Sequence, residues 1–110
     1  MPPSHFGGHI GVWRLGKGSA VYLPAAAPGA LLPVGDPHAA QGDGALVGRA
    51  IECSMTGTLQ VVLHKKATFE GKPFADLTYH QIETATDWMP TGYSHPDLSA
   101  VSAYGPKFML

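Results

Sequence analysis

The sequence predicts a mostly β protein, with antiparallel strands arranged as a sandwich or an open roll. Two stretches, 45–55 and 57–66, alternate apolar and polar residues with the period of two that is typical of a strand. The 14 glycines and 10 prolines are spread along the chain between aliphatic runs, which favours many short strands and turns over disorder. A helix signal appears only near the C-terminus, so we expect at most one short helix.

In the first third of the chain, residues 1–9 are predicted to form an irregular arm. VWRL, residues 12–15, is predicted to form a short strand, and GKGS, residues 16–19, a turn. AVYLP, residues 20–24, is predicted to form a strand that its proline ends. A Pro-Gly turn then leads into a short aliphatic run over residues 30–34.

The middle of the chain carries the clearest strand signals. The alternating stretches 45–55 and 57–66 are predicted to be neighbouring strands, joined by a bend at Thr56. FEGKPF, residues 69–74, has the glycine and proline of a hairpin loop, and DLTYHQIET, residues 76–84, is predicted to form a further strand.

The late helix signal lies in SHPDLSAVSAYGP, residues 94–106. Pro96 suits the first helical position, and Asp97 complements the positive end of the helix dipole. Gly105 and the proline after it would end the helix, so it is predicted to be short.

Composition and charge limit the function classes. The 110 residues suit a single domain, 1–110, that is large enough to bury a core. The net charge is −1, and Lys65 and Lys66 form the one adjacent basic pair, so no nucleic-acid partner is expected. No apolar run approaches the ~18 residues of a membrane span. Cys53 is the single cysteine, which excludes an intrachain disulfide, and we expect a cytoplasmic protein that does not bind membranes.

The loop GDPHAAQGDGALVG, residues 35–48, concentrates ionisable groups in a chain that is only 14% charged. Asp36, His38 and Asp43 offer the mixed carboxylate and imidazole donors that suit a divalent ion such as zinc, manganese or iron. Gly35, Gly42 and Gly44 allow the backbone to bring these side chains together. The alternative is a set of ordinary turns, because Asp-Pro and Asp-Gly pairs are common there.

The same loop carries a resemblance to a known family. The segment APGALLPVGDPHAAQGDGA, residues 27–45, resembles the acetamidase/formamidase family segment VPGALLSVGDPHAAQGDGE, and the ten residues GDPHAAQGDG are a specific match. The likeness continues on both sides and covers about 90 of the 110 residues. The further similar stretches are 6–24, 47–66 and 86–98.

The resemblance implies a β-sandwich-like, oligomeric hydrolase that cleaves short linear amides, such as formamide and acetamide, to a carboxylic acid and ammonia. It implies a divalent metal cofactor, with zinc expected first and calcium or manganese as the other candidates. His38 and Asp36 are the expected metal ligands, with second-shell orientation of the histidine as the alternative for Asp36. Asp43 and Glu52 are the expected catalytic groups for proton transfer. Gln41 is expected to hydrogen-bond the amide substrate or to brace the loop.

Glu52 and Gln41 also have simpler interpretations, in which neither residue takes part in the reaction. Alternation places Glu52 on the face opposite Ile51 and Cys53, where it would face either a cleft or solvent. Ala39 and its neighbour Ala40 are small enough to suit a one- or two-carbon acyl group beside the site.

The chain departs from the family pattern at three residues and in length. His9 and Gly11 stand where the family's GGN-hydrophobic-D motif has asparagine and aspartate, and Ala45 stands where the loop has glutamate. Family members are several times longer, so the chain is expected to be a fragment that forms a homo-oligomer or associates with the missing portion. The alternative function is therefore a non-catalytic fragment or pseudoenzyme that keeps the fold.

Overall fold

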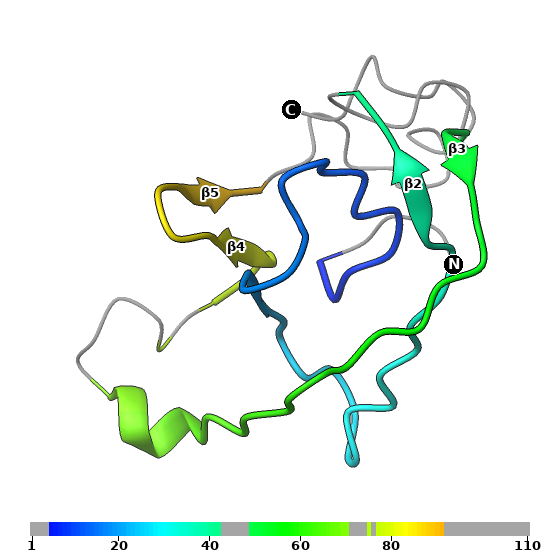
Figure 1. The fold of residues 1–110 in the computed structure, drawn as a ribbon. Coiled ribbons are helices and arrows are strands. Elements are labelled where there is room, and N and C mark those ends of the chain that lie inside the picture. The colour runs from blue at the N-terminus through cyan, green and yellow to red at the C-terminus, as the bar shows by residue number, and fades with distance from the viewer. Residues whose placement is uncertain (1–4, 43–48, 71–74, 76, 92–110) are drawn as a thin grey trace.

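The computed structural model describes residues 5–42, 49–70, 75 and 77–91, and these form short strands in two antiparallel sheets (Figure 1). One sheet has three strands in the order β1-β4-β5, and the other pairs β2 with β3. The bounds are β1 Ala20–Tyr22, β2 His38–Ala40, β3 Ile51–Glu52, the 3-10 helix η2 Lys66–Phe69, β4 Gln81–Glu83 and β5 Trp88–Pro90. The predicted antiparallel β class is confirmed, and the stacking into a sandwich or roll stays a prediction.

The three-stranded sheet holds the core of the described residues. Strand β4 lies in the middle, with Ile82 opposite Val21 on β1 and opposite Met89 on β5. The Ile82 side chain is fully buried, and His80, two residues earlier on the same face, is 4% exposed. The two buried residues lie on one face because residues two apart on a strand point to the same side.

Side chains fasten the strands of this sheet to one another. The Tyr22 hydroxyl on β1 donates a hydrogen bond to the Glu83 carboxylate on β4, at 2.6 Å. The turn between β4 and β5 closes on itself, because the amide of Thr84 donates to the carbonyl of Asp87 and the amide of Asp87 donates to the Thr84 hydroxyl, both at 2.9 Å. Such local side-chain bonds let a four-residue turn join two short strands.

Several predicted elements differ in the structure. Residues 12–15 contain a turn in place of the predicted strand, and the predicted strand 45–55 is limited to β3 among its described residues. Strand β5 was not predicted, since it is three residues long and ends in a proline. The hairpin loop predicted at 69–74 falls largely outside the described residues, and the predicted helix 94–106 falls wholly outside them.

Most of the predicted strand 57–66 is extended but lies in neither sheet of the described residues, and Lys66 already begins η2. From Cys53 to Lys65 the backbone contains neither a turn nor a bend, and it leads from β3 to η2 (Figure 1). We call residues 53–65 the extended segment. It belongs to neither sheet, so its period-two pattern predicts its conformation and not its pairing.

None of the helices in the described part of the chain combines the length and the apolar character needed to cross a bilayer.

Candidate functional site

The site is built on the two-stranded sheet. Strands β2 and β3 pair antiparallel, with His38 directly opposite Glu52. Ala40 lies opposite Ile51, so Ala39 is an extra residue on β2 and the register shifts there as in a β-bulge. The amide of Cys53 continues the pairing by donating to the carbonyl of Pro37 at 3.3 Å. The sequence predicts a loop here because its glycines and aspartates disfavour strands, and pairing with β3 overrides that tendency.

Three side chains converge at this sheet. Oε2 of Glu52 lies 3.3 Å from Nε2 of His38, and Oδ1 of Asp36 lies 3.5 Å from the same nitrogen. One donor atom from each of the three residues lies within 4.8 Å of the other two. Asp36 adopts the left-handed backbone conformation, with φ of 61°, which aspartate tolerates better than most residues. The irregular backbone that precedes β2 therefore places the Asp36 carboxylate beside the His38 ring.

Gln41 fixes the state of the His38 ring. Its Oε1 lies 2.5 Å from Nδ1 of His38, so Nδ1 carries the proton and donates it to the amide oxygen. This hydrogen bond is the largest factor that raises the pKa of His38 above its ordinary 6.5. Burial lowers the pKa, and the negative charges of Glu52 and Asp36 raise it.

The free nitrogen of His38 is suited to a cation. Its Nε2 is buried and makes no hydrogen bond, although two carboxylates face it. In the neutral ring this atom holds a lone pair, and a lone pair beside two negative oxygens is unfavourable unless a positive charge lies between them. One imidazole nitrogen and two carboxylate oxygens form a donor set that zinc and manganese accept. The residues present therefore fit a divalent cation.

The structure brings four of the five predicted site residues together. Asp36, His38 and Glu52 form the cluster, and Gln41 holds the His38 ring from its other side. The fifth, Asp43, lies outside the described residues. Sequence spacing links Asp36 to His38 but cannot show that Glu52, fourteen residues from His38, is its cross-strand partner.

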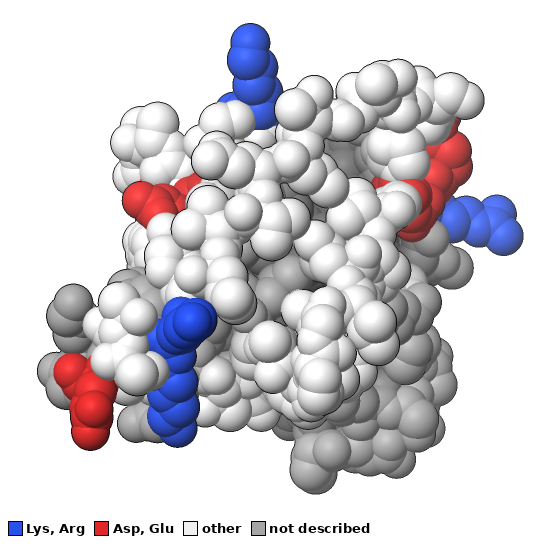
Figure 2. Space-filling view, turned by 90° about the horizontal axis from the view of Figure 1, so that it is seen from below, with Lys and Arg blue, Asp and Glu red and all other residues white. Residues whose placement is uncertain are grey.

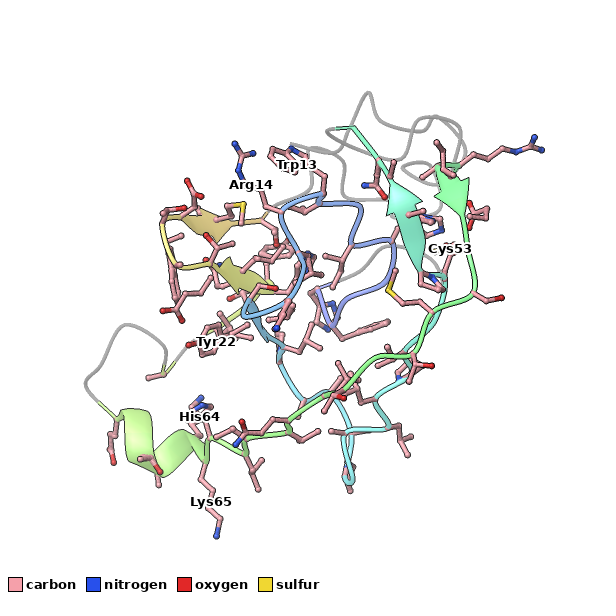
Figure 3. All side chains as sticks on the ribbon, viewed as in Figure 1. Trp13, Arg14, Tyr22, Cys53, His64 and Lys65 are labelled. Carbon is pink, nitrogen blue, oxygen red and sulfur yellow. The ribbon has the colours of Figure 1, made fainter. Side chains whose placement is uncertain are left out.

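His9 and Cys53 are not members of the cluster. His9, the residue at the family's asparagine position, has a φ of 47° and is not a member of the cluster found among the described residues. Cys53 is a free cysteine that points its thiol toward the Pro37 carbonyl, at 3.7 Å, which agrees with a packing role. Cys53 starts the extended segment and His64 lies near its far end, as Figure 3 shows.

Comparison with known proteins agrees with the sequence motif that forms this site. The sequence profile described as Acetamidase/Formamidase family matches residues 1–93, which include every described residue of the cluster. No curated protein and no solved structure matches the chain significantly. Because the matched region covers well over half of the 110 residues, the chain belongs to the acetamidase/formamidase family.

Proposed function

We propose that this protein hydrolyses short linear amides, such as formamide and acetamide, to a carboxylate and ammonia, with a divalent cation as its cofactor. Zinc is the first candidate, and manganese and calcium are the others. The observation that carries the proposal is the convergence of Asp36, His38 and Glu52 donor atoms within 4.8 Å, inside the region that matches the family profile.

Asp36 and His38 are the proposed metal ligands. His38 presents Nε2, which is buried and has no hydrogen bond, and Asp36 presents Oδ1 at 3.5 Å from it. The chemistry that a divalent cation supplies at such a site is polarisation of the amide carbonyl and a lowered pKa of a neighbouring water, toward ~7. Gln41 contributes by holding the His38 ring in the tautomer whose Nε2 faces the carboxylates.

Glu52 and Asp43 are the proposed proton-transfer groups. The Glu52 carboxylate is 55% exposed, so a water molecule and a substrate both have access to it. A carboxylate there takes a proton from the attacking water as the carbon–oxygen bond forms. The leaving nitrogen receives a proton as the carbon–nitrogen bond breaks, which gives ammonia and a carboxylic acid that ionises. Asp43 is the second candidate for that delivery.

Gln41 is also the proposed contact for the substrate. Its Nε2 is buried and makes no hydrogen bond within the described residues, although its Oε1 is engaged by His38. An amide N–H in that state can donate to a substrate carbonyl and so regain a hydrogen bond. Ala39 and Ala40, which follow His38 on β2, leave room for a small acyl group.

Ammonia release tests the proposal. Purified protein is incubated with formamide or acetamide and added zinc, manganese or calcium, beside His38→Ala and a matched surface variant, His5→Ala. We expect metal-dependent release from the wild type and from His5→Ala, and none from His38→Ala. Absence of release from folded wild-type protein with each metal would refute the proposed activity.

The variant Glu52→Gln separates two roles of that residue. If Glu52 transfers protons, the variant binds zinc as the wild type does and loses activity. If Glu52 is a metal ligand, zinc affinity falls together with activity. Calorimetric titration of zinc, run beside the ammonia assay, distinguishes these outcomes.

A non-catalytic module is the second candidate function, and the openness of the site favours it. The Asp36 side chain is 73% exposed, and an exposed carboxylate stays well hydrated and gains little from a nearby charge. Zinc binding without ammonia release would support this candidate. The non-catalytic candidate also agrees with the presence of Gly11 and Ala45, which replace acidic residues of the family pattern.

A further inference from the structure

One face of the three-stranded sheet carries two aromatic side chains and a carboxylate. The buried Ile82 and its cross-strand partner Val21 share the other face, so their neighbours in sequence, Glu83 and Tyr22, point away from it. Trp88 lies directly opposite Glu83 on β5 and therefore points to the same side as Glu83. Each of the three strands thus contributes one of these side chains.

Tyr22 and Trp88 lean toward each other across β4. Their ring centroids are 5.4 Å apart and their planes make an angle of 43°, although a whole strand separates β1 from β5. The ring of His64, near the end of the extended segment, lies 6.2 Å from the Tyr22 ring (Figure 3). A single cation can therefore lie within ~6 Å of both the Tyr22 and the Trp88 centroids, the range over which a ring face attracts it. We call Tyr22, His64, Glu83 and Trp88 the aromatic cluster.

Solvent reaches the aromatic cluster. Trp88 is 44% exposed, and Tyr22 and Glu83 are half-buried. Figure 2 views the molecule from below in the sense of Figure 1, and the charged side chains on that face stand apart from one another. A charged ligand is therefore attracted by the groups of the cluster itself and not by an extended patch of one sign.

Glu83 gives the aromatic cluster its negative charge. Its Oε2 accepts the hydrogen bond from the Tyr22 hydroxyl, and none of the described residues forms an ion pair with it. That hydrogen bond is the largest factor that raises the pKa of Tyr22 above its ordinary 10, so the hydroxyl keeps its proton and donates it. A carboxylate beside two ring faces favours a cation, because all three groups present negative potential to it.

We propose that the aromatic cluster binds an alkylammonium ion, with its nitrogen over the Tyr22 and Trp88 rings and an N–H donated to Glu83. The ring faces attract the positive charge, and the ring edges contact the alkyl chain. A divalent metal ion fits less well, because it needs several oxygen ligands and the cluster offers one carboxylate. This proposal is independent of the proposed amide hydrolysis, whose residues lie on the other sheet.

Titration with n-butylammonium, followed by NMR, tests the binding. The chain has two tryptophans, so a Trp13→Phe background leaves the indole N–H of Trp88 as the single reporter. We expect its resonance to shift saturably, with a dissociation constant on the order of 10 mM. The neutral molecule 1-butanol has the same chain length and should cause no saturable shift over the same concentrations.

Glu83→Gln tests the carboxylate in the same background. The variant removes the negative charge and keeps an oxygen that accepts the Tyr22 hydrogen bond, so the sheet is expected to stay folded. We expect the dissociation constant for n-butylammonium to rise by about three- to tenfold. Glu70→Gln makes the same change at an exposed glutamate outside the cluster and should bind as the parent does.

Trp88→Leu tests the ring face, with the NMR signals of the ligand as the readout. We expect this variant to bind n-butylammonium about threefold or more weakly. The matched control is Trp13→Leu, because Trp13 is similarly exposed and its ring already faces a cation of the chain, Arg14, at 4.4 Å from the centroid. Circular dichroism verifies that each variant is folded.

Three results would overturn the proposal. The first is the absence of a saturable shift of the Trp88 indole with n-butylammonium. The second is equal binding of 1-butanol, which would make the cluster an apolar patch without preference for charge. The third is an affinity that Glu83→Gln and Trp88→Leu leave unchanged, or that the two control variants lower equally.

Discussion

His38 takes part in strand pairing, in a side-chain hydrogen bond and in interactions with two carboxylates. Its ring is 16% exposed, Gln41 holds one nitrogen, and two carboxylates face the other. A histidine so fixed loses little rotational freedom on binding a cation, because its orientation is already set. We therefore expect the Gln41 hydrogen bond to contribute to the affinity for the proposed cation, although Gln41 is not one of the proposed ligands.

Gln41→Ala is expected to lower the affinity for zinc by about 10–100-fold, because the His38 ring loses the partner that fixes its tautomer. Calorimetric titration measures the change. Gln60→Ala, at an exposed glutamine of the extended segment, is the matched control and should bind as the wild type does. Unchanged affinity in Gln41→Ala would show that the hydrogen bond has no influence on the site.

The burial of His80 predicts that the stability of the protein depends on pH. Burial lowers the pKa of His80 below its ordinary 6.5 in the folded protein. As the pH falls below about 6.5, the unfolded chain takes up a proton that the folded chain does not, so the free energy of unfolding decreases. His80→Gln should therefore lose less stability than the wild type between about pH 7.5 and about pH 5.5.

Urea unfolding at the two pH values measures this difference. His5→Gln, at an exposed histidine outside both sheets, is the control and should keep the wild-type pH slope. If His80→Gln and the wild type lose the same stability on acidification, burial of His80 does not govern the acid response.

At the scale of elements, β4 carries the largest packing contribution of the described strands. It is the central strand of its sheet, and its Ile82 is fully buried. Removing one methyl group there leaves a small void that neighbouring strands cannot fill completely. The same methyl deletion at Ile51 on β3 leaves no internal void, because the Ile51 side chain is 64% exposed to solvent.

Ile82→Val is expected to lower the free energy of unfolding by about 1 kcal/mol. Ile51→Val makes the same deletion at an exposed position, and its effect should stay within about 0.5 kcal/mol. Chemical denaturation of both variants gives the comparison. Equal losses would mean that Ile51 is covered in solution or that Ile82 is not a core residue.

The strands also show what sequence can and cannot predict. The stretch 76–84 is predicted to form a strand, and the structure has β4 within it, with His80 and Ile82 buried. The equally regular pattern of the extended segment predicts its conformation, but pairing needs a partner that lies far away in the chain or in another copy. The β2 strand was not predicted, because its pairing with β3 is a tertiary interaction that outweighs a turn-rich composition.

The candidate site, too, could be predicted from the sequence only in part. Asp36 and His38 are two residues apart, so their proximity follows from the sequence. Glu52 joins them through the register of β2 and β3, including the extra residue at Ala39, which no local pattern indicates. A register one residue away would turn Glu52 to the other face of the sheet.

At the scale of the whole molecule, many large apolar side chains of the described residues are exposed. They include residues of the irregular stretch before β2, of β3 and of the extended segment, namely Leu31, Leu32, Val34, Ile51, Met55, Leu59, Val61, Val62 and Leu63. We expect such a surface to make stability depend on association, because covering it removes apolar area from water.

The melting temperature is therefore expected to rise with protein concentration, as mass action requires when only the folded chain associates. Val61→Lys, which places a charge in this apolar surface, should melt at a temperature that depends much less on concentration. Differential scanning fluorimetry across a dilution series measures both. A wild-type melting temperature that is constant over the series would indicate a monomeric folded state.

The pairing of His38 with Glu52 has a consequence for local opening of the backbone. Two short strands alone form a ribbon of marginal stability, which opens readily to solvent. If Glu52 is a metal ligand together with His38, which is the second of the two roles that Glu52→Gln separates, the proposed cation binds the closed ribbon and not the open one. Added zinc should then slow hydrogen exchange at the Cys53 amide, which donates across the ribbon, more than at the amide of Thr84 in the distant turn. Cation binding at the site would thus be measured as slower local opening of the backbone around it.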